Sequence, residues 1–551
     1  MWGIFTMKKE YIKRITGALL SLIIIASLIL TACSKTGNGI DMGKAPESDM
    51  SKVNESREIP EYDGKEKTCY EVFVYSFSDS DGDGIGDFKG LTDNLSYIND
   101  GDPEKGNDLS ADMIWLMPIC PSPTYHKYDV TDYMDVDPQY GTMEDFEKFI
   151  DAAHKNGVSV IIDLVLNHTS IEHPWFKKAV EEEKAGEALK YADYYNFTTE
   201  KMAGYEPLDG TDLYYEARFW SGMPDLNLDN EDVRKEIEDI VSFWLDKGVD
   251  GFRLDAVTSY YTGDDKKNIE FLTWLNKTVK EKNPDAYIVG ECWAGLNTYA
   301  KYYESGVDSF FDFQFADSDG AMANVVRGTK KAASYGKAVA DAEDMLDEIN
   351  PDHINAPFIA NHDMGRSSGF FVNDDGTKTK MAGAVYLLSG GTTYTYYGEE
   401  IGMRGSGKDE NKRAPMLWDE NVKAAANGIK PESNFDPLSA QKDDPKSIYE
   451  YYRQAIRIRN NFPVIKCGKT EVLEAMSDDD VLSMKKNDPD GKYESVIVIY
   501  NFSDEEKDVK ISEEGYNNIV GVLYTGNEEA KITDGTVKVP ARGVVILKEK
   551  P

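Results

Sequence analysis

The chain has 551 residues and a formal net charge of −38, with 41% hydrophobic and 11% aromatic residues. This composition can supply a large core, and the length exceeds that of one ordinary domain. The negative charge argues against a nucleic-acid partner, because basic surfaces supply most of the affinity for phosphates. It also argues against docking of the folded protein on anionic lipid. A neutral ligand would not feel this charge.

The first 33 residues predict an export signal. A basic stretch at residues 8–14 precedes an apolar run at residues 15–30, which is shorter than the roughly 20 residues that a membrane span needs. The run ends in Leu-Thr-Ala-Cys, which resembles the lipobox of bacterial lipoproteins, so Cys33 would be lipidated and become the N-terminus. The alternative is an ordinary secretory signal, or an uncleaved anchor, that happens to contain a cysteine. We expect an exported protein, held on a membrane or at the cell surface through Cys33.

Residues 34–67 are rich in Ser, Gly, Pro and charged residues without an apolar period, which predicts a flexible linker.

Beyond the linker, the spacing of the remaining cysteines fits no zinc site. We expect these four to be buried thiols, with one chance disulfide left open: Cys69, Cys120, Cys292 and Cys467.

From residue 68 onward, apolar runs alternate with helical patterns, which predicts a (β/α)8 TIM barrel. The expected strands are residues 70–77, 113–118, 158–166, 249–257, 287–291, 307–313, 356–360 and 393–397. The barrel would occupy residues 68–168 and 223–464. Residues 169–222, after the third strand, would form an inserted subdomain. Short alternating runs over residues 465–551 predict a C-terminal antiparallel β-sandwich.

Polar residues follow several of these runs, and barrel active sites lie at the C-terminal ends of the strands. Those residues are Asp163, Asn167, His168, Arg253, Asp255, Glu291, His362 and Asp363. Arg253 and Asp255 are two positions apart on one strand and share a face, so the guanidinium would keep Asp255 ionised, as a nucleophile requires. The negative charges of Asp255 and Asp363 would raise the pKa of Glu291, which suits a proton donor. Glycoside cleavage needs such a pair. The alternative is a set of buried ion pairs that only closes the barrel.

Together these segments resemble the conserved regions of the alpha-amylase family, glycoside hydrolase family 13, from about Tyr70 to the C-terminus. The resemblance implies a retaining enzyme with Asp255 as nucleophile, Glu291 as general acid/base and Asp363 as third carboxylate, and carboxyl groups about 5–5.5 Å apart. It implies a structural role for Asp163. It also implies that five residues contact the substrate: His126, Tyr128, His168, Arg253 and His362.

The segment Met223-Pro224-Asp225-Leu226-Asn227 resembles that of a group between the oligo-1,6-glucosidases and the neopullulanases, which includes alpha-amylases. We therefore expect a monomeric enzyme of the alpha-amylase type that cleaves alpha-1,4 bonds in starch-type glucans or maltooligosaccharides. The alternatives within the family are an oligosaccharide-specific alpha-glucosidase, a neopullulanase-like enzyme and a transglycosylase. A non-catalytic binding protein on the same barrel is disfavoured, because all three acids are present.

An acidic loop follows the first expected strand and has oxygen ligands at alternate positions. The candidate calcium ligands are the carboxylates of Asp79, Asp81, Asp83 and Asp87 and the carbonyl of Ile85. Gly90 stands at the twelfth position, where an EF-hand has Glu, so a calcium sensor is disfavoured. The family resemblance implies a structural Ca²⁺ in this loop. The alternative is an acidic turn without metal.

Overall fold

A computed structural model describes residues 50–103, 106, 108–186 and 190–550 of the chain. Residues 48–551 form one compact unit, within which all elements below lie. The predicted export signal, Cys33 and the first part of the predicted linker lie outside the described residues. Within the described part, no helix combines the length and the apolarity that a membrane span requires.

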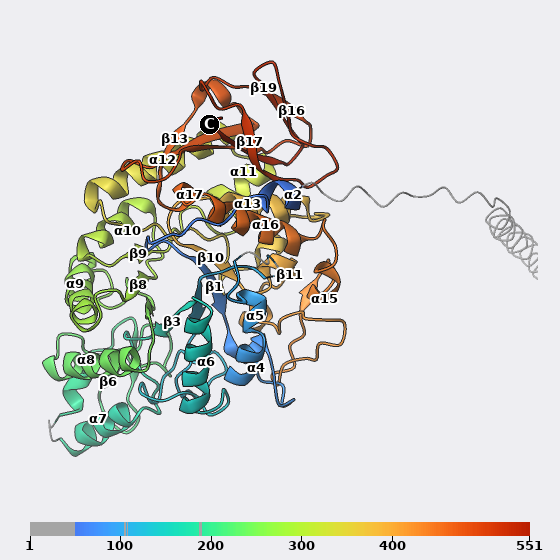
Figure 1. Ribbon diagram of the computed structural model, residues 1–551. Helices are drawn as coiled ribbons and strands as arrows, with labels where there is room; N and C mark the ends of the chain where they lie inside the picture. Colours follow the sequence, from blue (N-terminus) through green and yellow to red (C-terminus); the bar gives the residue numbers. More distant parts are fainter. Residues whose placement is uncertain (1–49, 104–105, 107, 187–189, 551) are drawn as a thin grey trace, which may run out of the picture. The chain divides into compact units, whose positions relative to one another are not determined.

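A parallel sheet forms the centre of the unit (Figure 1). Its seven strands are β1 (Thr68–Val72), β2 (Met113–Leu116), β3 (Ser159–Leu164), β7 (Gly251–Leu254), β8 (Tyr287–Gly290), β9 (Ser309–Phe310) and β10 (Thr393–Tyr396). They follow the order β10-β1-β2-β3-β7-β8-β9, which confirms the predicted barrel with seven of its eight strands.

The expected seventh strand, residues 356–360, is not a regular strand, but its backbone fills the gap in the barrel. Ala356 makes a single parallel bridge to Phe311. On the other side, Tyr394 donates its N–H to the carbonyl of Pro357 at 3.1 Å. The segment therefore joins β9 to β10, and the barrel closes through a short irregular stretch.

Alternation along the strands separates two cores. Residues that point into the barrel, such as Trp115, Ile161 and Phe311, form one cluster. Their strand neighbours, such as Ile114 and Ile162, pack outward against the helices. Both faces are buried, which explains the continuous apolar runs in the sequence.

The helices alternate with the strands. Those of the barrel and its loops are α3 (Val74–Phe77), α4 (Phe88–Asp93), α5 (Leu95–Ile98), α6 (Met143–Lys155), α8 (Glu231–Asp246), α9 (Asp265–Lys282), α10 (Leu296–Tyr302), η2 (Tyr303–Ser305), α11 (Ala321–Arg327), α12 (Ala332–Ile349), η3 (Ser367–Phe370), α13 (Thr377–Leu387), η4 (Glu399–Ile401), α14 (Asp409–Lys412), α15 (Leu438–Gln441), α16 (Ile448–Asn461) and α17 (Val464–Cys467). Helix α6 begins with a reciprocal capping box between Thr142 and Asp145. A two-stranded ribbon of β11 (Met403–Arg404) and β12 (Glu432–Ser433) lies in the loop after β10.

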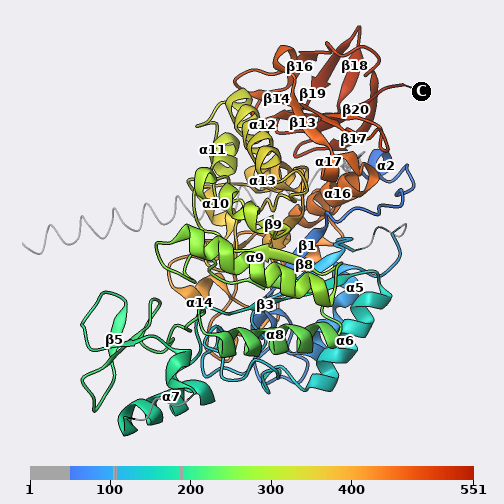
Figure 2. The same cartoon turned by 90° about the vertical axis from the view of Figure 1, so that its left-hand side faces the viewer.

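The inserted subdomain extends from one end of the barrel (Figure 2). It contains α7 (Pro174–Ala185), η1 (Ala192–Tyr194) and a small sheet of β4 (Phe197–Thr198), β5 (Tyr205–Pro207) and β6 (Tyr214–Glu216). Isolated antiparallel bridges, His168 to Asp225 and Tyr195 to Leu226, fasten the end of the subdomain beside the end of β3.

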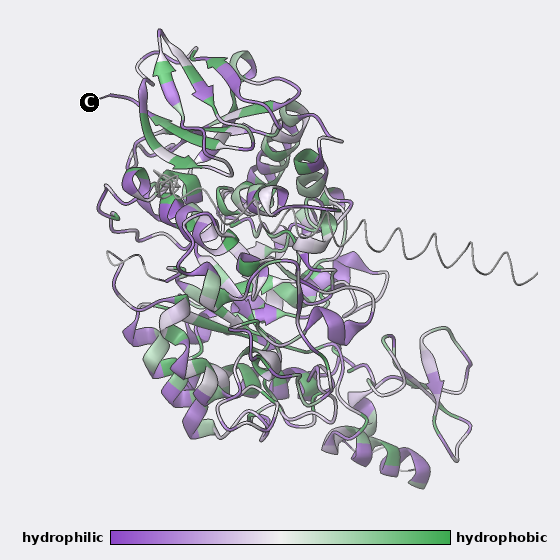
Figure 3. Cartoon of the chain, turned by 90° about the vertical axis from the view of Figure 1, so that its right-hand side faces the viewer, coloured by the Kyte–Doolittle hydropathy of each residue, from purple (hydrophilic) through white to green (hydrophobic). Residues whose placement is uncertain are grey.

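The C-terminal region is an antiparallel sandwich, as predicted. Its five-stranded sheet contains β13 (Lys469–Val472), β14 (Val481–Asn487), β15 (Val496–Asn501), β20 (Val544–Lys548) and β17 (Asn518–Leu523), and its three-stranded sheet contains β16 (Lys507–Lys510), β19 (Thr536–Val539) and β18 (Lys531–Thr533); η5 (Glu474–Met476) precedes β14. Figure 3 shows hydrophobic and hydrophilic stretches on these strands. On β15, Ile497 and Ile499 face the three-stranded sheet, whereas Val496 and Val498 join the core shared with the barrel helices.

The prediction of a flexible linker up to residue 67 is wrong for its last part. Helix α2 (Met50–Asn54) packs against the sandwich and α16, with Met50 and Asn54 buried. The Asn54 amide donates to Gln454 and to the carbonyl of Val522, both at 2.9 Å. These partners lie hundreds of residues away, so the polar local composition of residues 50–54 did not reveal them.

The four described cysteines are free, and all but Cys467 are buried.

Candidate active site

The sequence-predicted acids meet at the C-terminal ends of the barrel strands. Backbone hydrogen bonds continue past the strand ends and fix their positions. The N–H of Glu291 donates to the carbonyl of Leu254 at 2.9 Å, and the N–H of Val257 donates to the carbonyl of Glu291 at 3.0 Å. Asp255 and Glu291 therefore lie on adjacent strand ends, and each is 7% exposed.

Arg253 on β7 is the centre of this group. Its Nη1 lies 2.7 Å from Asp163 Oδ1 and 2.7 Å from Asp255 Oδ1. Its Nη2 lies 2.9 Å from Glu291 Oε2. The guanidinium is fully buried and stacks 5.1 Å from the centroid of the Trp115 ring. One cation thus holds three carboxylates, and the two predicted catalytic acids share it.

The chain turns sharply directly after Asp255. Ala256 has a φ of +44°, a conformation that costs a non-glycine residue energy. This turn aims the Ala256 N–H at Glu291 Oε2, 3.0 Å away. Oε2 therefore accepts one hydrogen bond and lies against the guanidinium, whereas Oε1 accepts no hydrogen bond from the described residues and is the oxygen on which a proton can reside. Burial raises the pKa of Glu291; Arg253 opposes this, and the charges of Asp255 and Asp363 add to it. The sequence predicted the direction, but burial contributes more than the like charges.

His362 and Asp363 form a second charged group. His362 Nδ1 lies 2.5 Å from Glu71 Oε1, and its Nε2 lies 3.0 Å from Asp363 Oδ2. Burial would lower the pKa of His362, but Asp363 and Glu71 outweigh it and raise it to about 9. The imidazole is therefore protonated at neutral pH. Burial opposes the ionisation of Asp363, yet His362 and Arg413 hold the pKa of that carboxyl far below its usual range.

Tyr128 links the two groups. Its hydroxyl lies 2.7 Å from His362 Nε2 and 3.3 Å from Asp163 Oδ2. Its ring stacks on the His362 ring with centroids 5.7 Å apart, and only 9% of the residue is exposed. A ring this deeply packed holds His362 in place and leaves little area for sugar stacking.

The other two predicted histidines lie beside this cluster. The N–H of Tyr128 donates to His126 Nδ1 at 3.1 Å, which leaves Nε2 of the neutral ring to carry a proton. Burial lowers the pKa of both His126 and His168, so both are neutral at neutral pH. His168 Nε2 is buried and has no hydrogen-bond partner among the described residues. Such a group is suited to binding a ligand hydroxyl.

Three contributors were missed by sequence reasoning. Glu71 on β1 pairs with His362, Trp115 on β2 donates to Asp163 at 3.3 Å, and Arg413 Nη2 lies 2.8 Å from Asp363 Oδ1. A single acid inside the apolar first run was a usable signal for Glu71. The pairing of Arg413 with Asp363 crosses fifty positions of the sequence and left no local pattern.

The acidic loop after β1 fits a calcium ion in part. One carboxylate oxygen from each of Asp79, Asp81 and Asp87 lies within 4.8 Å of the others. Gly84 has a φ of +93°, which permits the turn. Asp83 is not in this group. Its Oδ1 accepts the N–H of Ile85 at 2.7 Å. Three converging carboxylates on an exposed loop match the oxygen ligands of Ca²⁺.

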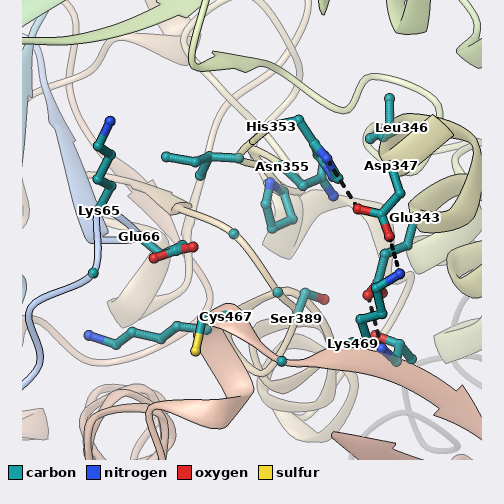
Figure 4. A pocket seen from close by; sticks show the side chains of 18 of the residues that line it. Lys65, Glu66, Glu343, Leu346, Asp347, His353, Asn355, Ser389, Cys467 and Lys469 are labelled. Carbon is teal, nitrogen blue, oxygen red and sulfur yellow. Dashed lines mark hydrogen bonds and ion pairs between the residues drawn. The ribbon is translucent and has the colours of Figure 1, made fainter. Parts of the chain in front are cut away.

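A separate cavity of about 760 Å³ lies between the barrel and the C-terminal sandwich (Figure 4). None of the predicted site residues lines it. Several of its charged groups are engaged with partners: Asp347 lies 2.6 Å from Lys469 and 3.6 Å from His353, and Glu343 accepts the backbone N–H of Thr470 at 2.9 Å. The chemistry-bearing residues are therefore gathered at the strand ends and not in this cavity.

Comparisons with known proteins agree with this geometry. The model of the alpha amylase catalytic domain matches residues 71–468. Alpha-amylase 3 of Dictyoglomus thermophilum is 39% identical over 88% of this chain and 93% of its own length. A probable oligo-1,6-glucosidase 3 of Bacillus subtilis is 30% identical over 74% of this chain and 86% of its own length. The solved structure of Eubacterium rectale Amy13B superposes with a TM-score of 0.86 at 45% identity, covering 92% of this chain and 99% of that chain.

The family model covers well over half of the chain, and both relatives are matched across most of their length. The barrel, the inserted subdomain and the C-terminal sandwich are matched together in the solved structure. The chain is therefore a glycoside hydrolase of the alpha-amylase family, glycoside hydrolase family 13.

Proposed function

We propose that this protein is a retaining hydrolase that cleaves alpha-1,4-glucosidic bonds of starch-type glucans or maltooligosaccharides. The observation that carries the proposal is the sharing of one buried guanidinium by Asp255 and Glu291. Asp255 and a carboxyl group with a raised pKa, Glu291, are thereby held against one cation at the strand ends. Glycoside cleavage with retention needs this pair.

In the first step, Asp255 attacks the anomeric carbon and forms a covalent glycosyl ester. The bond to the leaving glucan breaks at the same time, and Glu291 donates its proton to the departing oxygen. In the second step, Glu291 takes a proton from water, whose oxygen attacks the anomeric carbon and releases Asp255. This single proton transfer leaves Glu291 protonated and Asp255 a free carboxylate, so the site is regenerated.

The second charged group supports the sugar ring. Asp363 would accept hydrogen bonds from ring hydroxyls, and its negative charge would stabilise the oxocarbenium-like transition state. The neutral His126 and His168 would donate to or accept from neighbouring hydroxyls, whereas the protonated His362, whose nitrogens face Glu71 and Asp363, can only donate. The buried His168 Nε2, which has no partner among the described residues, supports this assignment.

The choice of alpha-1,4 bonds rests on relatives. The matched relative named alpha-amylase is 39% identical, whereas the one named oligo-1,6-glucosidase is 30% identical. The alternatives are an oligosaccharide-specific alpha-glucosidase, a neopullulanase-like enzyme or a transglycosylase. Chromatography of the products from starch, pullulan and cyclodextrin distinguishes them. Rapid shortening of starch to mixed maltooligosaccharides is expected, and release of glucose alone would reject endo-acting cleavage.

The catalytic assignment is tested with Asp255→Asn and Glu291→Gln. We expect Asp255→Asn to lose turnover on every substrate. We expect Glu291→Gln to lose about 10²- to 10⁴-fold on glucans but much less on a maltosyl fluoride, whose leaving group needs no proton. Gln can keep its oxygen on the Ala256 N–H, so the geometry is preserved. Wild-type turnover by either variant would reject the assignment.

Two further properties belong to the proposal. Asp79, Asp81 and Asp87 would hold a structural Ca²⁺, whose charge would offset their mutual repulsion. The protein would be exported and anchored in a membrane through a lipid on Cys33. Release of a Cys33→Ser variant into the medium, with the wild type retained by the membrane, is the expected result. Equal retention of both would reject the lipid anchor.

A further inference from the structure

A contact across the rim of the barrel joins two loops that are far apart in the sequence. Tyr125 lies in the loop after β2, and Asp409 begins α14 in the loop after β10. The Tyr125 hydroxyl donates to Asp409 Oδ2 at 2.6 Å. The same oxygen lies 2.8 Å from Arg413 Nη1. One carboxylate oxygen therefore ties both loops together.

Arg413 continues this contact into the active site. Its Nη2 lies 2.8 Å from Asp363 Oδ1, so the guanidinium spans two acids, one with each terminal nitrogen. The Arg413 side chain is 4% exposed, whereas that of Asp409 is 41% exposed. Lys412 adds a second tie, because its Nζ donates to the carbonyl of Asp363 at 2.7 Å and lies 3.7 Å from Asp409 Oδ1.

The outer end of this chain of contacts is rigidly packed. The Tyr125 ring meets the His126 ring edge-on at 5.6 Å, and meets Phe73 at 6.2 Å and Tyr75 at 5.9 Å. Tyr125 is therefore a fixed anchor. On the side of the site, Arg413 is held by its ion pair to Asp363 and by a hydrogen bond from Nε to the carbonyl of His362 at 3.4 Å. The second ion pair, to the anchored Asp409, holds the other terminal nitrogen and so fixes the orientation of the guanidinium.

We infer that Asp409 is a positioning residue for the third carboxylate. It holds Arg413 in place, and through Arg413 it aligns the Asp363 carboxylate with the reacting sugar. This inference rests on the proposed function of Asp363. Asp409 itself lies at the rim and reaches Asp363 through Arg413 and, more weakly, through Lys412, so its effect should appear in turnover more than in folding.

The test is Asp409→Asn, which keeps the shape of the side chain and removes its charge. We expect kcat on maltooligosaccharides to fall about 10- to 100-fold, as for other residues that orient a reacting group. The loss should persist on maltosyl fluoride, because Asp363 acts on the sugar ring and not on the leaving group. Asp409→Glu should recover part of the rate, since its longer carboxylate can still reach Arg413. The melting temperature should stay near that of the wild type.

Two further variants separate the possible failures. Glu432→Gln neutralises an exposed acid 3.9 Å from Arg404 in the same loop, and it should keep the wild-type rate. Asp363→Asn should be inactive; full turnover by this variant would reject the proposed function of Asp363. If Asp363→Asn is inactive while Asp409→Asn turns over at the wild-type rate, the positioning role alone is overturned. Restoration of Asp409→Asn by maltosyl fluoride would overturn it as well.

Discussion

Replacement of Arg253 by Met tests how the buried acids at the strand ends are held. Arg253 is fully buried and pairs with Asp163, Asp255 and Glu291 at 2.7, 2.7 and 2.9 Å. Met fills much of the same volume without a charge. The variant therefore leaves three buried carboxyl groups beside one another with no cation between them. Removing one partner of a single buried ion pair costs about 3–5 kcal/mol.

The cost should depend on pH in a defined direction. In the wild type, burial raises the pKa of Asp163 to about 7 and raises that of Glu291, and Arg253 opposes both shifts. Without Arg253 these pKa values rise further. A carboxyl group whose pKa is higher in the folded than in the unfolded state destabilises the fold as the pH rises above about 4, its unfolded value. The penalty of Arg253→Met should therefore grow as the pH rises through about 7, the wild-type pKa of Asp163, by up to about 1.4 kcal/mol per pH unit for each carboxyl group.

The assay is the melting temperature of wild type and variant at a series of pH values from 5 to 8. Arg459→Met is the matched control, because Arg459 is equally buried but donates to the carbonyls of Leu387 and Ser389 and pairs with no carboxylate of the described residues. It should lower the melting temperature by an amount that changes little with pH. A penalty for Arg253→Met that is equally independent of pH would refute the reasoning.

Three more predictions concern separate parts of the molecule. Asp81→Asn should lower the melting temperature in the presence of Ca²⁺ and abolish the effect of EDTA; an undiminished EDTA effect would exclude this loop as the metal site. In Glu71→Gln, the pKa of His362 should fall from about 9. The stabilisation by the ion pair of Glu71 and His362 is fully present below about pH 6.5, the unfolded pKa of histidine, and is lost as the pH rises through about 9. The difference in melting temperature between wild type and variant should therefore be larger at pH 6 than at pH 10. An equal difference at the two pH values would contradict the pairing. Asn54→Ala should cost about 1–3 kcal/mol, because it leaves the buried N–H and carbonyl of Val522 without their side-chain partner; an unchanged melting temperature would show that α2 does not stabilise the domain.

The barrel was predictable because its strands are buried on both faces and therefore read as apolar runs. The strand ends were less predictable. The first expected strand, residues 70–77, covers the last part of β1 and then α3, because the turn between them is as apolar as the strand. The expected strand at 356–360 has the right composition and the right place in the barrel, but its backbone pairs at isolated points. The amino-acid composition of a segment indicates whether it is buried. Regular strand pairing depends on the neighbouring strands, which the local sequence does not specify.

The candidate site was predictable to the extent that each residue follows a strand. Strand ends in a closed barrel meet, so Asp255 and Glu291 could be brought together from their positions alone. Partners supplied by distant loops could not. Tyr125, Asp409 and Arg413 lie in loops whose approach depends on the packing of the whole rim, and no period or spacing connects them. The same holds for Asn54, whose partners belong to α16 and the C-terminal sandwich.

The paired contacts divide the site into two groups of unequal charge. On the side of Glu71 and Asp363, three acids, these two and Asp409, face three cations, the protonated His362, Arg413 and Lys412. Acids and cations balance there, and the pKa of Asp363 is held low. In the proposed mechanism, this balance keeps Asp363 ionised against a positively charged transition state.

On the side of Arg253, three acids share one cation, so charge is not balanced when all three are ionised. A buried excess of negative charge is relieved by proton uptake. Glu291 and Asp163 both have raised pKa values, and Glu291 is the one whose Oε1 is free. Asp163 accepts hydrogen bonds on both oxygens, from Arg253 on Oδ1 and from Trp115 on Oδ2. The proton that relieves the excess therefore belongs on Glu291 Oε1, where the proposed mechanism needs a donor to the glycosidic oxygen.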